Sequence, residues 1–223
     1  MTSPGTDTPR PGKGCGPAAT LALLALLGLA AAAAPRPAPA AAERFEIDPD
    51  HLSVGFLVSH VGYAGVLGMF REAGGRFSYD EDTGRISDVR IVIRTASVFT
   101  NHEERDGHLR GEDFLDVARH PEMVFTAGAA EPAPADAPGR PARYRVQGEL
   151  ELLGRSRPVT LDLWVNKQAR YPLGLGGVFP PYVVGVSGRG SFKRSDYGMD
   201  YAVENGWVGD EIRLIIEFEA RRQ

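Results

Sequence analysis

The sequence is almost free of cysteine. Cys15 is the only cysteine among 223 residues, so no disulfide can form within the chain and its core must hold the fold together. Positive charge is not in excess either, because 25 lysines and arginines face 29 aspartates and glutamates, for a net charge of −4. This balance argues against nucleic acid as a partner, since nucleic-acid surfaces need clustered positive charge.

Standard catalytic and metal-binding motifs are also missing. Residues 101–108 hold a dense group of His, Asp and Glu side chains, but no standard zinc-ligand spacing is present. Gly185-Val186-Ser187-Gly188 is similar to part of a nucleophile elbow, yet Arg189 stands where the motif requires glycine. The glycine-rich residues 174–177 precede Pro180-Pro181, which excludes a following helix that would bind phosphate. We therefore predict no catalytic residue, no metal site and no cofactor.

The longest apolar run lies within residues 1–42. Arg10 and Lys13 precede an Ala- and Leu-rich run at 17–34, and two A-x-A sites follow at 38–40 and 40–42. This order is typical of a secretory signal peptide, so residues 1–42 are interpreted as a cleaved signal and residues 43–223 as the mature domain. An uncleaved N-terminal anchor is the alternative, because the run approaches the ~18 residues that begin to span a bilayer.

Cleavage would change the chemistry of the mature chain. It would remove Cys15, one acid and three bases, which changes the net charge from −4 to −6. The mature domain would then have no thiol, and it would be periplasmic or secreted. The acidic balance argues against strong attraction to an anionic lipid surface.

Alternation of apolar and polar residues dominates the mature chain. In the clearest case Tyr144, Val146, Gly148, Leu150 and Leu152 alternate with charged or polar residues, and similar runs occur near 52–60, 89–93, 159–165, 184–192 and 212–218. Such alternation predicts strands with one buried and one solvated face. About eight strands of this kind can bury their apolar faces together in a closed antiparallel barrel, and a sandwich is the alternative.

One helical pattern interrupts the strands. It covers residues 105–118, with apolar positions that include Phe114 and Leu115. Pro121 ends it, because proline lacks a backbone donor and favours an extended conformation at the preceding residue. A helix with an apolar face has to pack on a sheet or close the end of a barrel. The fold class is therefore all-β, an eight-stranded antiparallel barrel with a short helical insertion.

A set of motifs in order resembles the YceI-like family. The set includes Phe45-Glu46-Ile47-Asp48-Pro49-Asp50-His51, Arg105-Asp106-Gly107-His108-Leu109, His120-Pro121-Glu122-Met123-Val124-Phe125 and Arg194-Ser195-Asp196-Tyr197-Gly198-Met199. The resemblance covers nearly all of residues 44–220 and implies an extended lipocalin-like barrel in a periplasmic or secreted protein. It also implies a polyisoprenoid or isoprenoid quinone in an elongated apolar cavity, often within a homodimer. The loops at 131–141 and 171–181 depart from the compact family pattern.

This resemblance directs the choice of site residues. Gly and Val are frequent on the inward faces, which favours an interior with space for a ligand. The side chains predicted to line it are Phe56, Val58, Ile91, Ile93, Phe114, Leu115, Val146, Leu150, Leu161 and Leu163. His60 continues the inward phase of its strand, so it is either a satisfied core histidine or a contact of the lipid head group beside Asp106 and His108.

Three functions fit these expectations. The first is an exported, non-enzymatic carrier that binds an isoprenoid lipid and contacts a membrane transiently during lipid exchange. The second is an enzyme that modifies such a lipid, for which His60 and Asp106 are the available acid and base. The third is a filled barrel that acts as a protein-interaction module.

Overall fold

The computed structural model describes residues 42–133, 141–172 and 180–223. Its strands are β1 (Glu43–His60), β2 (Ala64–Phe70), β3 (Ala73–Tyr79), β4 (Ile86–Arg94), β5 (Val98–Phe99), β6 (Glu122–Ala130), β7 (Ala142–Leu152), β8 (Arg155–Arg170), β9 (Tyr182–Lys193) and β10 (Glu211–Arg222). The helix α1 spans Glu103–Arg110, and the 3-10 turns are η1 (Thr95–Ser97) and η2 (Arg194–Tyr197). The predicted signal peptide and much of both predicted loops lie outside the described residues.

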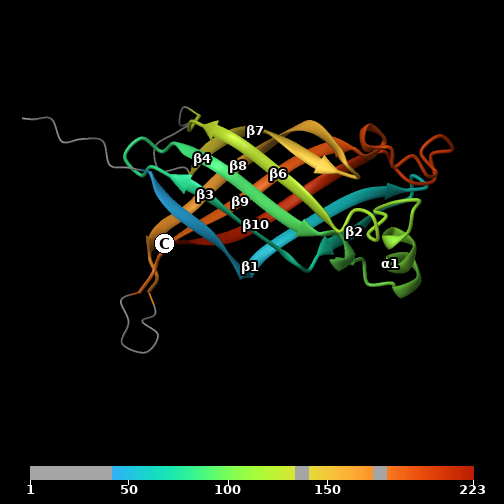
Figure 1. Ribbon diagram of the computed structural model, residues 1–223, viewed down its shortest axis with the longest axis horizontal. Coiled ribbons are helices and arrows are strands. Elements are labelled where there is room, and N and C mark those ends of the chain that lie inside the picture. The colour runs from blue at the N-terminus through green and yellow to red at the C-terminus, as the bar shows by residue number, and fades with distance from the viewer. Residues whose placement is uncertain (1–41, 134–140, 173–179) are drawn as a thin grey trace, which may run out of the picture. The chain divides into compact units, whose positions relative to one another are not determined.

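Eight of the strands form a closed antiparallel barrel (Figure 1). Their order is β10, β9, β8, β7, β6, β4, β3 and β1, and β1 also pairs with β10. β2 pairs with the second half of β1, and β5 pairs with β2. The predicted all-β, eight-stranded lipocalin-like barrel is confirmed.

A bulge marks the seam at which β1 closes on β10. Ile47 pairs with Ala220 whereas Leu52 pairs with Phe218, so residues 48–51 of β1 have no partners in the ladder. Within the bulge lies Asp48, whose side chain is buried. Its carboxylate accepts a hydrogen bond from His51 Nδ1 at 2.7 Å and pairs with Arg221 of β10 at 2.5 Å. These contacts join the two strands where their backbone pairing is interrupted.

The helical insertion is shorter than the predicted 105–118. The helix α1 begins after His102, whose Nδ1 accepts from the Arg105 backbone N–H, and it ends at Gly111. Turns follow, and Asp116 has a left-handed φ of 43°, which an α-helix cannot contain. The apolar spacing that indicated one long helix is produced by a short helix and a series of turns.

Inward-facing glycines allow side chains on adjacent strands to pack closely. A Cβ atom at Gly68 would overlap the ring of Phe56, and a Cβ at Gly148 would overlap the ring of Phe125. At these positions the space that glycine leaves is therefore filled by a neighbouring ring. The expectation that inward glycines leave room for a ligand is therefore wrong at Gly148, where the ring of Phe125 fills the space.

The segment 198–210 is held in place by Arg194, which is 1% exposed. Its guanidinium donates hydrogen bonds of 2.7–2.8 Å to the backbone carbonyls of Met199, Tyr201, Val208 and Gly209. Burial lowers the pKa of Arg194, although the charges of Asp210 and Asp200 oppose that shift. One side chain thus organises the segment between η2 and β10.

Replacing Arg194 should destabilise the fold strongly. In Arg194→Met four carbonyl groups lose their donor, and each unsatisfied buried group costs about 1–3 kcal/mol. We expect the free energy of unfolding to fall by at least about 3 kcal/mol, measured by urea denaturation. Arg194→Lys should recover only part of it, because an ammonium cannot reproduce the planar fork. Full stability in Arg194→Lys would contradict this account.

The Asp48 cluster should make stability depend on pH. Burial raises the pKa of Asp48, but hydrogen bonds from His51 and Asp50 and the charge of Arg221 outweigh it, so the pKa is lowered from 3.8. The hydrogen bond to Asp48 raises the pKa of His51 from 6.5. The Asp48 contribution is therefore complete above about pH 4 and is lost as pH falls through its lowered folded-state value. The His51 contribution is complete below about pH 6.5 and is lost as pH rises through its raised value.

An Asp48→Asn variant separates these two effects. Between about pH 4 and about pH 6.5 its free energy of unfolding should be below that of the unmodified protein. The difference should shrink in strong acid. The pKa of His51 should also move back towards 6.5, which an NMR titration of the imidazole measures. An unchanged His51 titration in the variant would show that the Asp48–His51 contact does not form in solution.

Candidate functional site

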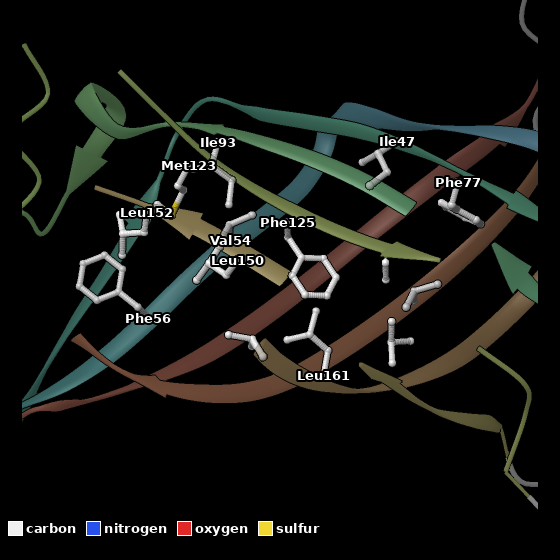
Figure 2. Close-up of a cluster of buried hydrophobic side chains, with 14 of the residues drawn as sticks. Ile47, Val54, Phe56, Phe77, Ile93, Met123, Phe125, Leu150, Leu152 and Leu161 are labelled. Carbon is white, nitrogen blue, oxygen red and sulfur yellow. The ribbon is translucent and has the colours of Figure 1, made fainter. Parts of the chain in front are cut away.

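An apolar cavity of about 170 Å³ lies inside the barrel. One water molecule needs roughly 10–15 Å³ of such space, so the cavity is more than ten times larger. Figure 2 shows Val54, Phe125 and Leu150 pointing from different strands into the common interior. The cavity follows from closure, because the inward faces of all eight barrel strands are apolar and meet inside the ring.

All ten side chains predicted to line the interior lie on the cavity wall. They are Phe56, Val58, Ile91, Ile93, Phe114, Leu115, Val146, Leu150, Leu161 and Leu163. Their contact with a ligand stays a prediction.

The cavity wall also includes residues that were not predicted. Val54, Leu214 and Ile216 continue period-two runs of their strands, so the same signal could have identified them. Met199 and Val208 come from the segment 198–210, which has no regular period. Only the folded chain shows that this segment reaches the interior.

An aromatic cluster closes one end of the cavity. Phe45 stacks on Phe77 with ring centroids 5.5 Å apart, and Phe77 meets the edge of Phe218 at 6.2 Å. Phe218 lines the cavity whereas Phe45 and Phe77 do not. The rings of Phe45 and Phe77 therefore pack behind Phe218, away from the cavity. We call these three residues the aromatic plug.

The opposite end is covered by the residues after α1 and by the segment 198–210. Phe114 lines the cavity, and its ring lies 5.3 Å from that of Tyr201. Tyr201 is 45% exposed and also contacts the ring of His108 at 5.0 Å. At this contact, two side chains separate the cavity from solvent.

The three predicted head-group contacts do not lie on the cavity wall. His60 is exposed at the end of β1, where its backbone forms an isolated bridge with Val208. Asp106 is buried, and its carboxylate accepts from the backbone N–H and hydroxyl of Thr100 at 2.8 and 2.5 Å. His108 is exposed and contacts Asp113 at 2.9 Å. Within the described ranges no hydrogen bond joins His60 to Asp106, and a role for these residues at a head group stays a prediction.

Arg194 is the one charged residue among the described residues that line the cavity. Its guanidinium is bonded to the four carbonyls of the segment 198–210 and lies 5.7 Å from the ring centroid of Phe114. The remainder of the lining is apolar side chains and one glycine. The cavity therefore suits hydrocarbon better than any charged molecule.

A group of potential metal ligands lies elsewhere, at the seam of the barrel. Asp48, His51 and Glu219 each place a ligand atom within 4.8 Å of the others. However, Arg221 pairs with the same Asp48 oxygen that accepts from His51. A cation would have to displace this guanidinium, so the cluster is better explained as an ion-pair network.

None of the described helices is long and apolar enough to cross a bilayer.

Comparison with known proteins places this geometry in a family. Residues 45–220 match the family model described as YceI-like domain. The chain is 34% identical over 184 residues to a UPF0312 protein of Pectobacterium carotovorum subsp. carotovorum, covering 82% of this chain and 88% of that protein. It is also 34% identical over 173 residues to a UPF0312 protein of Azotobacter vinelandii, covering 78% and 83%.

Solved structures agree on the fold. The Campylobacter jejuni YCEI protein superposes with a TM-score of 0.62 at 26% identity, covering 74% of this chain and 90% of that chain. A polyisoprenoid binding domain from Saccharophagus degradans superposes with a TM-score of 0.57 at 13% identity, covering 80% and 98%. The family match over most of the barrel and the relatives above 30% identity show that this chain belongs to the YceI-like family.

Proposed function

We propose that the protein is an exported, non-enzymatic carrier that binds a polyisoprenoid or an isoprenoid quinone in the barrel cavity. The observation that carries this proposal is the cavity itself, which is lined by apolar side chains from seven of the eight barrel strands, all but β3. The polyisoprenoid binding domain of S. degradans, which shares the fold, supports the same ligand class. During exchange, the lipid would pass between the cavity and a membrane.

The energetics suit a hydrocarbon ligand. Burial of one CH₂ group contributes about 0.8 kcal/mol, so one isoprene unit contributes roughly 4 kcal/mol before costs. Ordering the chain and losing its freedom of motion reduce this sum. Several units can still bind tightly with almost no polar contact, which matches a wall whose charged residue, Arg194, already donates to four backbone carbonyls.

A binding role is favoured over turnover by the position of the titratable groups. His60 and Asp106 were the available acid and base, but Asp106 is bonded to Thr100 and neither residue lines the cavity. A general acid or base has to reach the reacting atoms directly or through one water. Carriage without chemistry is therefore the proposal, and a filled barrel is disfavoured by the space inside.

Native protein should contain the lipid. We expect mass spectrometry of an organic extract of the purified mature protein to show an isoprenoid at a stoichiometry near one per chain. Denatured and washed protein serves as the control for surface adsorption. An extract without isoprenoid, from protein purified out of cells that make these lipids, would contradict the carrier proposal.

Filling the cavity should remove the ligand. Leu150→Trp adds an indole to the cavity wall, whereas Glu151→Trp adds the same group on the exposed outer face of β7. We expect Leu150→Trp to lower the amount of bound isoprenoid at least tenfold, because losing about 1.4 kcal/mol of binding energy is sufficient. Glu151→Trp should retain it, with folding checked by circular dichroism. Equal lipid content in both variants would place the ligand outside the cavity.

Export gives a separate prediction. If residues 1–42 are a signal peptide, protein recovered from the periplasm or medium should begin at residue 41 or 43. Intact-mass measurement distinguishes these ends from the full chain. A full-length, membrane-bound product would support the uncleaved anchor instead.

A further inference from the structure

Large apolar side chains exposed to solvent gather at one end of the barrel. Within the described residues the large apolar side chains that are 37–91% exposed are Val61, Tyr63, Leu67, Met69, Phe99, Tyr201 and Trp207. We call these seven residues the collar. They come from the β1–β2 turn, from β2 and β5, and from the segment 198–210.

Backbone contacts join these parts into one surface. The Val61 N–H donates to the Trp207 carbonyl at 2.8 Å, which ties the β1–β2 turn to the segment 198–210. Met69 pairs with Phe99 across β2 and β5. Leu67 and Met69 point outward from β2, because the alternate residue Gly68 faces the ring of Phe56 in the interior.

The collar adjoins the cavity at the end opposite the aromatic plug. Trp207 precedes Val208, which lines the cavity. Tyr201 contacts Phe114 at the point where two side chains separate the cavity from solvent. A hydrocarbon that leaves the cavity here would pass directly beside the exposed apolar surface.

We propose that the collar is a docking surface for a lipid bilayer, on which the protein loads or releases its ligand. This proposal rests on the proposed carrier function and identifies the surface that would serve it. Docking buries the exposed apolar side chains at the bilayer interface, and it brings the end of the cavity beside Phe114 and Val208 to the membrane.

The chemistry of the β1–β2 turn matches a bilayer. Residues 61–70 contain no Asp, Glu, Lys, Arg or His, so no charge has to lose its hydration on insertion. The backbone donors of Val61 and Tyr63 are already bonded, to Trp207 and His60. Such internal bonding is needed because hydrocarbon offers the backbone no partners. Tyr63 and Trp207 are the residue types that favour the membrane–water interface.

Charge at the edge of this uncharged turn is complementary to lipid head groups. Arg71 directly follows residues 61–70, and its guanidinium lies 5.5 Å from the centroid of the Phe99 ring. Basic groups at this depth can face head-group phosphates. Asp200 and Glu204 are also exposed in the segment 198–210, so docking is driven by apolar burial and needs no anionic lipid.

The exposed tip of the β1–β2 turn favours a bilayer over a protein partner. Tyr63 is 91% exposed at the tip of its turn, where it protrudes into solvent. A stable protein interface needs about 800 Å² of complementary surface on each partner. A bilayer accommodates a protruding apolar tip without any matching shape. We therefore assign the collar to lipid.

The two tryptophans allow a direct test with vesicles of phosphatidylcholine alone. Trp207 belongs to the collar. Trp164 is a half-buried residue of β8, and its ring centroid lies 5.7 Å from the Arg143 guanidinium. In a Trp164→Phe protein, the emission of Trp207 should shift to shorter wavelength when vesicles are added. Co-sedimentation should fall at least fivefold in Trp207→Ser and in Tyr63→Ser, and it should be unchanged in Trp164→Ser. Moderate salt should have little effect.

Each alternative outcome has a definite meaning. Sedimentation of Trp207→Ser and Tyr63→Ser equal to that of unmodified protein would overturn the proposal. So would a dimer in analytical ultracentrifugation that both collar variants dissociate, because a second copy would then cover this surface. If the extract contains isoprenoid but the protein does not sediment with vesicles, the carrier function is retained and only the docking surface is rejected. Vesicle binding without any extracted isoprenoid would reject the carrier function instead.

Discussion

The pairing of β1 with β10 is the constraint on which the rest of the molecule depends. This pairing joins the first strand to the last and turns an open sheet into a ring. Without it, two strand edges and the apolar inward faces of eight strands would meet water. With it, those faces enclose a space that their side chains do not fill. The cavity therefore results from closure of the barrel, and no single motif forms it.

The barrel could be predicted from sequence because alternation is local. In β7, Val146 and Leu150 alternate with polar residues, and the same two side chains line the cavity. The sequence pattern predicts the position of the helical insertion correctly but overestimates its length. The reason is that Phe114 and Leu115 keep an apolar spacing that turns can also satisfy. Inward glycines indicate empty space, yet at Gly148 the ring of Phe125 occupies it.

The parts that sequence did not reveal depend on contacts between distant residues. Asp48 meets Arg221 only because β1 and β10 are neighbours, 173 residues apart in the chain. Arg194 belongs to a motif that indicated the family, but its role follows from carbonyls in a segment without periodicity. His60 has the inward phase of β1, yet as the last residue of that strand it lies beyond the packed interior and is exposed.

The β1–β10 seam and the contacts of Arg194 with the segment 198–210 respond differently to acid. A guanidinium stays protonated and a peptide carbonyl stays neutral at any physiological pH, so the four hydrogen bonds from Arg194 to the segment 198–210 do not depend on a titrating group. The seam instead relies on a carboxylate and an imidazole, both of which titrate. Mild acidification would therefore strengthen the β1–β10 seam by protonating His51, and only acid strong enough to protonate Asp48 would weaken it, while the hydrogen bonds of Arg194 to the segment 198–210 would persist.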